Sequence, residues 1–64
     1  MTNLKMIRKE SGLSQAKLAE ASGVNVRMIQ HYEQGMKDIN KAHGITLYKL
    51  ATALGCRMED LIEE

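Results

Sequence analysis

Four polar side chains of a particular kind lie close together in the middle of the chain. The stretch SGVNVRMIQHYEQG, residues 22–35, contains Arg27, Gln30, His31 and Gln34. Guanidinium, amide and imidazole groups all form directional hydrogen bonds. Arginine matches the O6 and N7 atoms of guanine, and glutamine matches the N6 and N7 atoms of adenine. These residue types therefore offer the chemistry of base-edge recognition.

Helical geometry gathers these four residues, the polar stripe, on one side. At about 100° per residue, they fall roughly 100–200° away from Ile29, whereas Tyr32 and Glu33 fall within about 60° of it. Val26 lies at the edge of the stripe. An exposed helix face is usually polar simply because it meets water, but such faces are rich in Glu and Lys. The stripe has neither, and no carboxylate in it would repel phosphate, so its composition favours DNA over a merely solvated face.

Five glycines divide the chain into segments with a helical pattern. The sequence predicts helices over about 2 or 3–11, 14–21, 26–34, 40 or 41–54, and 58–63. In the fourth segment, apolar residues recur at i, i+3, i+4 and i+7, namely Leu47, Leu50, Ala51 and Leu54. Gly44 lies inside that segment and should weaken its first turn by about 1 kcal/mol relative to Ala. The expected architecture is an all-α, compact five-helix bundle.

The connection between the second and third helices is short. Only residues 22–25 separate them, and Gly23 can adopt the left-handed conformation of a sharp turn. Ser14 and Asn25 are good N-caps for the two helices. Ala19 is small enough for a close crossing. Such a turn forces a steep crossing, which predicts a helix-turn-helix.

Size and composition limit the class of protein. The chain has 64 residues, so it is at most one domain, and 44% of its residues are apolar, as in a folded globule. Cys56 is the single cysteine and can form no internal disulfide, which indicates a reducing compartment. No apolar run is long enough to span a bilayer or to serve as a signal peptide. The sequence therefore predicts a cytoplasmic protein.

Charge is distributed unevenly along the chain. The net charge is +1, but four acidic residues lie in the last six positions. The preceding 58 residues carry nine basic and four acidic residues, a balance of +5. A basic body with an acidic end is compatible with a polyanionic partner. An ordinary solvated surface explains the same charges equally well.

Other kinds of site find little support in the sequence. Two histidines, His31 and His43, and one cysteine are too sparse for a metal site. Cys56 follows a glycine and is expected to be a buried structural thiol, since nucleophilic catalysis would need a neighbouring base. No glycine-rich phosphate loop is present. The chain is expected to be no enzyme and to need no cofactor or metal.

Two stretches, GLSQAKLAEASGVNVRMIQHYEQG and TLYKLATALGC, resemble the helix-turn-helix domain of the phage Cro and CI repressors, the xenobiotic-response-element family. The matching positions are Gln15, Leu18, Ala19, Gly23, Val24, Ile29, Tyr32, Glu33 and Gly35. Ser22, Tyr32 and the long loop MKDINKAHG depart from the commonest pattern. The resemblance covers essentially the whole chain and implies a lambda-repressor-like fold that binds DNA.

The resemblance also implies roles for particular residues. The DNA contacts that it assigns are Gln15 and Lys37 to phosphate, Gln34 near the second phosphate track, and Asn25, Val26, Arg27, Gln30 and His31 in the major groove. The family pairs an arginine of its first helix with the glutamate after the recognition-helix core. Here that pair is Arg8 and Glu33, and the inward angle of Glu33 favours the pairing over two unrelated surface charges.

These observations predict a sequence-specific transcriptional regulator, a repressor of phage or mobile-element type that binds an operator as a homodimer. The expected self-contact lies around Leu61 and Ile62. The alternative is a protein-interaction module on the same fold, antitoxin-like or an anti-repressor. A protein-binding face should carry apolar or aromatic anchors, and the polar stripe offers only Val26 beside it.

Overall fold

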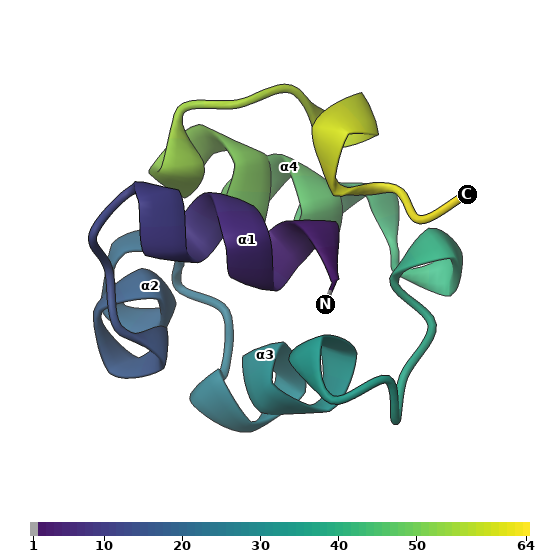
Figure 1. The fold of residues 1–64 in the computed structure, drawn as a ribbon, viewed down its shortest axis with the longest axis horizontal. Coiled ribbons are helices and arrows are strands. Elements are labelled where there is room, and N and C mark those ends of the chain that lie inside the picture. The colour runs from purple at the N-terminus through teal and green to yellow at the C-terminus, as the bar shows by residue number, and fades with distance from the viewer. Residues whose placement is uncertain (1) are drawn as a thin grey trace.

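Residues 2–64 fold into four α-helices and two single turns of 3₁₀ helix (Figure 1). The computed structural model describes residues 2–64. The elements are α1 (Asn3–Glu10), α2 (Gln15–Ser22), α3 (Val26–Glu33), η1 (Ile39–Lys41), α4 (Gly44–Leu54) and η2 (Met58–Leu61). The described residues contain no β-strand, and none of their helices is long and apolar enough to cross a membrane. The all-α prediction is confirmed.

Every α-helix and η2 contribute to a single apolar core. The five fully buried aliphatic side chains come one from each of these elements, namely Leu4, Leu18, Ile29, Leu50 and Leu61. α4 packs against α2 and η2, and α3 packs against α2 and α1. Because the helices are short, each is held mainly by this shared burial and not by its intrinsic propensity.

The prediction of five helices is wrong, because four α-helices form among the described residues, and the fourth of them also begins later than predicted. The segment expected to run continuously from residue 40 or 41 to Leu54 is broken, because Ala42 and His43 are extended. Asn40 explains the break: its side-chain amide donates to the Glu63 carbonyl and accepts from the Glu63 N–H. This tertiary pairing holds residues 39–41 as a separate 3₁₀ turn. Gly44 is consequently the first residue of α4 and does not lie inside it.

The last expected helix, 58–63, is also wrong, since only the 3₁₀ turn η2 forms there. Asn3 Nδ2 donates to the Ile62 carbonyl at 2.9 Å, and the Asn3 N–H donates to the Glu63 carboxylate. Together with Asn40, these bonds draw the chain end out of a helical path. Leu61 is fully buried in the core and Ile62 packs against the core while partly exposed, so the self-contact expected around these two residues stays a prediction in which Leu61 has no accessible surface.

The helix-turn-helix formed by α2 and α3 agrees with the prediction. Gly23 ends α2 with a φ of 76°, and its N–H donates to the Ala19 carbonyl at 2.9 Å. Only residues 23–25 separate the two helices, which pack against each other with Ala19 partly buried. A side chain at position 23 would be strained at this φ, because L residues avoid it.

Candidate nucleic-acid interface

The outer side of α3 carries most of the residues that the sequence singled out. Asn25, Val26, Arg27 and Gln34 are exposed, and Gln30 and His31 are partly exposed. The inner side of the same helix buries Ile29, Tyr32 and Glu33. The helix therefore separates its core residues from a surface of hydrogen-bonding side chains.

Asn25 has a structural task at the start of α3. Its Oδ1 accepts the N–H of Arg27 at 2.7 Å, which caps the helix. The amide nitrogen of Asn25 remains available as a donor next to the first turn. Within residues 2–64 the ion pairs are Arg8–Glu33 and Arg57–Asp60, so no carboxylate there engages the guanidinium of Arg27. Arg27 is thus exposed and has its donors available for an external acceptor.

A buried ionic network lies behind the exposed face. Arg8 Nε donates to Glu33 Oε2 at 2.6 Å and Nη2 donates to Glu33 Oε1 at 3.0 Å, a two-pronged contact between α1 and α3. Arg8 Nη1 donates to the Leu13 carbonyl at 2.8 Å. The predicted Arg8–Glu33 pair is confirmed. Both residues are buried and hydrogen-bonded, which fixes the orientation of α3 relative to α1.

The network shifts the ionisation of both partners. Burial alone would raise the pKa of Glu33, but the hydrogen bonds from Arg8 and Gln15 and the positive charges of Arg8 and Lys5 outweigh it and lower that pKa. The hydrogen bond to Glu33 raises the pKa of Arg8 against the opposing effect of burial. The pair is therefore charged at neutral pH, as its geometry requires.

Gln15 makes a structural contact that the sequence analysis did not predict. It is the first residue of α2, is partly buried, and its Nε2 donates to Glu33 Oε1 at 3.0 Å. The structure thus ties Gln15 to the network, while its backbone N–H lies at the start of α2. Nothing in the sequence around Gln15 signals this bond, because its partner lies 18 residues away.

Lys37 is exposed in the turn that follows α3. The N–H groups of Met36 and Lys37 both donate to the His31 carbonyl, at 2.9 and 3.2 Å, so the turn folds back on the end of the helix. Gly35, at a φ of 79°, permits this reversal. Lys37 is therefore held beside the C-terminal end of α3.

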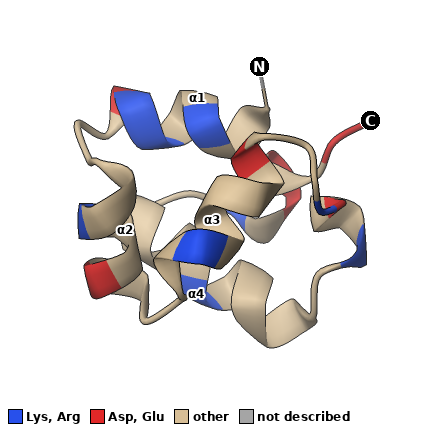
Figure 2. Ribbon diagram, turned by 90° about the horizontal axis from the view of Figure 1, so that it is seen from below, with Lys and Arg blue, Asp and Glu red and all other residues tan. Residues whose placement is uncertain are grey.

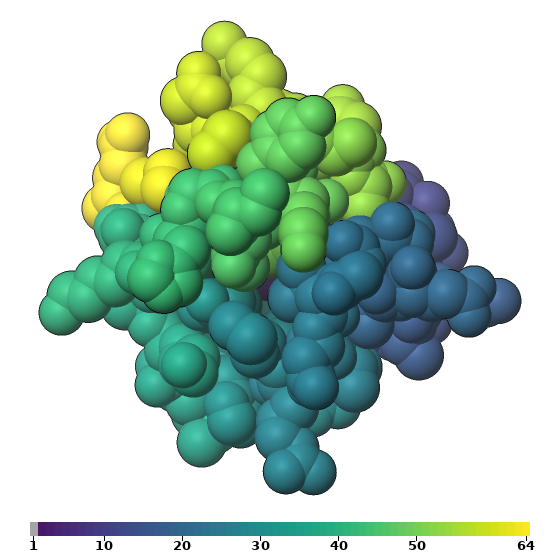
Figure 3. Space-filling model, turned by 180° about the vertical axis from the view of Figure 1, so that it is seen from behind, coloured from purple at the N-terminus to yellow at the C-terminus, as the bar shows by residue number. Residues whose placement is uncertain are grey.

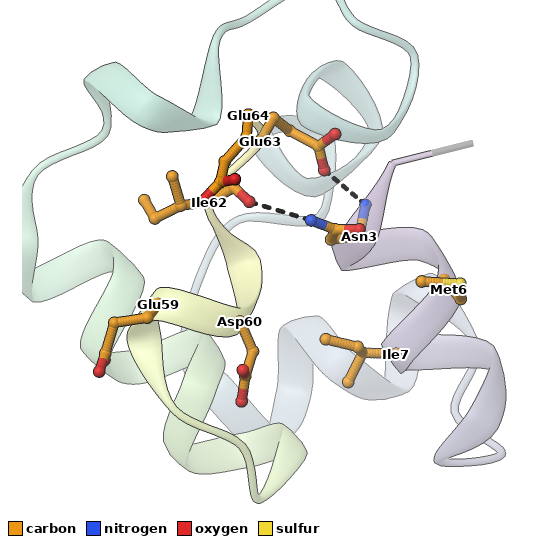
Figure 4. Close-up of a pocket in the computed structure, with 8 residues that line it drawn as sticks. All are labelled: Asn3, Met6, Ile7, Glu59, Asp60, Ile62, Glu63 and Glu64. Atoms are coloured by element: carbon orange, nitrogen blue, oxygen red, sulfur yellow. Dashed lines mark hydrogen bonds between the residues drawn. The ribbon is translucent and has the colours of Figure 1, made fainter.

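Charge is divided between two parts of the surface. Seen from the α3 side, basic residues are spread over all four helices and the loop after α3, whereas the C-terminal tail is acidic (Figure 2). An open groove between α1 and the chain end is lined by Asn3, Met6, Ile7, Glu59, Asp60, Ile62, Glu63 and Glu64 (Figure 4). Its four carboxylates would repel a polyanion, so the groove is unsuited to nucleic acid.

The described residues offer little for other chemistry. They contain no group of three or more His, Cys, Asp or Glu side chains placed to hold a metal ion. Cys56 is partly exposed and packs against the core. Burial raises the pKa of its thiol, and the charge of Asp60 raises it further, so the thiol is a poor nucleophile at neutral pH.

Comparison with known proteins gives one result. A family model described as Helix-turn-helix matches residues 4–61, which covers most of the chain and includes α2, α3 and the turn between them. No match was found among curated proteins or among solved structures.

Proposed function

Because the chain belongs to the Cro/CI-type helix-turn-helix family and is therefore a DNA-binding regulator, we propose that it is a sequence-specific transcriptional repressor. In this proposal its 64 residues act as one DNA-binding domain that binds an operator as a homodimer in the cytoplasm. It acts without a cofactor or catalytic step.

The observation that carries the proposal is the outer side of α3. It presents a guanidinium, amides and an imidazole, and it contains no carboxylate. We assign base-edge contacts to Asn25, Val26, Arg27, Gln30 and His31, with Arg27 as the guanine-reading residue. Gln15, Gln34 and Lys37 contact the phosphate backbone around this helix. Gln15 does so through its backbone N–H and the second hydrogen of Nε2, whose other hydrogen is donated to Glu33.

The mechanism is occlusion of a promoter. Two copies related by a two-fold axis insert their α3 helices into successive major grooves, about 34 Å apart along the DNA. The described part of the chain measures 24 × 21 × 20 Å, which is less than this repeat, so one copy can occupy each major groove without overlapping the other. Reading two half-sites doubles the number of base pairs recognised, which raises specificity.

The second candidate function is a protein-interaction module on the same fold. One observation favours it, namely that α4 exposes Ile45 and Tyr48. The outer side of α3 offers only Val26 as an apolar contact, so a protein partner would have to bind away from this helix.

Selection from a random duplex pool tests the proposal. We expect enrichment of an inverted repeat by the purified chain, and loss of preference at one position of each half-site for Arg27→Ala. Arg57→Ala is the matched control, since it removes an equal charge from an exposed arginine outside α3. Enrichment of a single unrepeated half-site would contradict the dimer, and enrichment of no motif at low salt would favour the interaction module.

A further inference from the structure

One apolar side chain interrupts the polar outer side of α3. Val26 is 37% exposed. The other hydrophobic residues of the helix lie in the core or pack against it, namely Met28, Ile29 and Tyr32. Elsewhere on a protein surface a single exposed valine needs no explanation. Here its neighbours are the hydrogen-bonding side chains assigned to base edges, so this position offers a different chemistry at the same interface.

Local structure does not explain a valine at position 26. Asn25 already supplies the cap of α3, because its Oδ1 accepts the Arg27 N–H. Val24 is the residue that anchors the entrance to the helix, since it is buried in the same core as Ile29. A β-branched residue is also a weaker helix former than Ala, Glu or Lys. Val26 therefore adds little to the folding of α3, and its exposed surface is available to a ligand.

The position of Val26 is the one that meets base edges. It is the first residue of α3, and in helix-turn-helix proteins the N-terminal residues of the second helix contact the bases. Seen from behind, the segment that runs from α2 through the turn into α3, coloured blue to teal, lies open at the surface (Figure 3). Around the helix, Gln30 lies about 40° and Arg27 about 100° from Val26. A duplex that meets Arg27 and Gln30 therefore also meets Val26.

We propose that Val26 reads a methyl group, the 5-methyl group of a pyrimidine in the major groove. The inference rests on the proposed DNA-binding function and names the chemical group that one residue of that interface recognises. Among the groups that base pairs present in the major groove, the C5-methyl of thymine is apolar, whereas the others are hydrogen-bond donors and acceptors. Valine has no hydrogen bond to give them, but it buries a methyl group. The same methyl group occurs in 5-methylcytosine, so both bases fit the contact.

The shape of the valine side chain suits this contact. A β-branched side chain in a helix holds one preferred χ1 rotamer, so its two methyl groups are fixed before binding and little entropy is lost. The contact buries about one methyl group, which corresponds to about fourfold in affinity per half-site. Consecutive Cα atoms lie about 3.8 Å apart and base pairs about 3.4 Å apart, so the methyl group should lie within about two base pairs of the guanine that Arg27 reads.

Base substitution in a selected site tests the proposal. The purified chain first selects its site from a random duplex pool, and each thymine of one half-site is then replaced by deoxyuridine, which lacks the methyl group. We expect one position at which this removal weakens binding about fourfold. At that position, 5-methyldeoxycytidine should also bind about fourfold tighter than deoxycytidine. Neither comparison changes a hydrogen-bonding group of the base pair. Tightest binding with thymine names thymine as the natural source of the methyl group, and tightest binding with 5-methylcytosine names methylated DNA.

Substitutions in the chain assign the effect to one side chain. Val26→Ala should remove both methyl effects, because the shortened side chain no longer reaches the methyl group, and should keep the preference for the guanine that Arg27 reads. Val26→Ile keeps a branched side chain and should keep both effects. Ile45→Ala is the matched control, since it shortens an exposed aliphatic side chain on α4 and should leave both effects unchanged. Thermal melts establish that the variants are folded.

Two results would overturn this inference and leave the proposed function standing. One is a selected motif in which no position responds to the methyl group. The other is a response that persists in Val26→Ala, which would assign the methyl group to another residue. Enrichment of no motif from the random pool would instead overturn the proposed function, and the methyl contact with it.

Discussion

On the inner side of α3, Glu33 is buried and hydrogen-bonded to Arg8 and Gln15, whereas on the outer side Arg27 and Gln34 are exposed to solvent. Both sides carry polar groups, and Glu33 and Gln34 are neighbours in the sequence. Burial makes the difference. Polar groups that are buried must satisfy one another, so they fix the helix in place, whereas exposed ones keep their donors and acceptors for a ligand. Substitutions on the two sides should therefore change different measurements.

The largest effect is expected from the apolar centre of the inner side. Ile29→Ala removes a fully buried side chain and should lower the free energy of unfolding by about 2–5 kcal/mol. In a domain whose total stability is of order 5–15 kcal/mol, such a loss unfolds a substantial fraction of the molecules. Chemical denaturation measures the change. Val26→Ala on the exposed edge of α3 is the control, and a similar loss in both variants would contradict the division between the sides.

The next largest loss of stability is expected from the ionic network of Arg8, Gln15 and Glu33. Arg8→Ala leaves the buried Glu33 carboxylate without its main partner and should cost about 1–3 kcal/mol of stability. Arg57→Ala breaks the exposed Arg57–Asp60 pair and should cost less than about 1 kcal/mol. Thermal melts of the two variants give the comparison. An Arg8→Ala melt that matched the parent would reject a stabilising role for the network.

On the outer side, Arg27→Ala should leave the melt unchanged and act on DNA binding. The loss should be about 1–3 kcal/mol on the preferred operator, with relaxed discrimination at one position of the half-site. Binding to the operator and its single-base variants measures both quantities, with Arg57→Ala as the control for lost charge. If discrimination survived intact, α3 would not read bases through Arg27.

Acidification should lower the free energy of unfolding through the buried Glu33 on the inner side of α3. Because the pKa of Glu33 is lower in the folded chain than in the unfolded one, its contribution is complete above the unfolded pKa of about 4.3. That contribution is lost as the pH falls through the folded pKa. The effect should be smaller than that of Arg8→Ala, since a neutral carboxyl still accepts hydrogen bonds. Unfolding between pH 7 and pH 2 should therefore show a smaller loss for Glu33→Gln than for the parent; equal losses would assign acid sensitivity to other groups.

The smallest effect is expected from Lys37, in the turn that follows α3. Lys37→Ala should weaken binding to all duplexes alike and reduce the slope of log K against log salt by about one unit, because a lysine on phosphate releases one counterion. Titrations at several salt concentrations, on operator and random duplex, provide the slope. A changed preference among single-base variants would mean that Lys37 reaches a base edge.

Much of the helix-turn-helix could be predicted from neighbouring residues. The caps at Ser14 and Asn25, the left-handed Gly23 and the apolar spacing around Ile29 are local signals, and the structure agrees with them. Neighbouring residues alone could not predict the Arg8–Glu33 pair, because the two residues lie 25 positions apart. The inward angle of Glu33 and the family resemblance together located it.

The sequence by itself determined the elements whose signals are local, and the tertiary structure decided where distant polar groups meet. The local sequence around Asn40 is compatible with a helix. Its side-chain amide, however, binds the Glu63 backbone and breaks the expected helix ahead of Gly44. Gln15 reads as a surface residue at a helix start, yet it donates to Glu33. Whether Ile45 and Tyr48 are buried is visible only in the packed fold, which leaves both exposed. Caps and turns are fixed within a few residues, whereas the partner of an amide and the burial of a side chain depend on the whole packed chain.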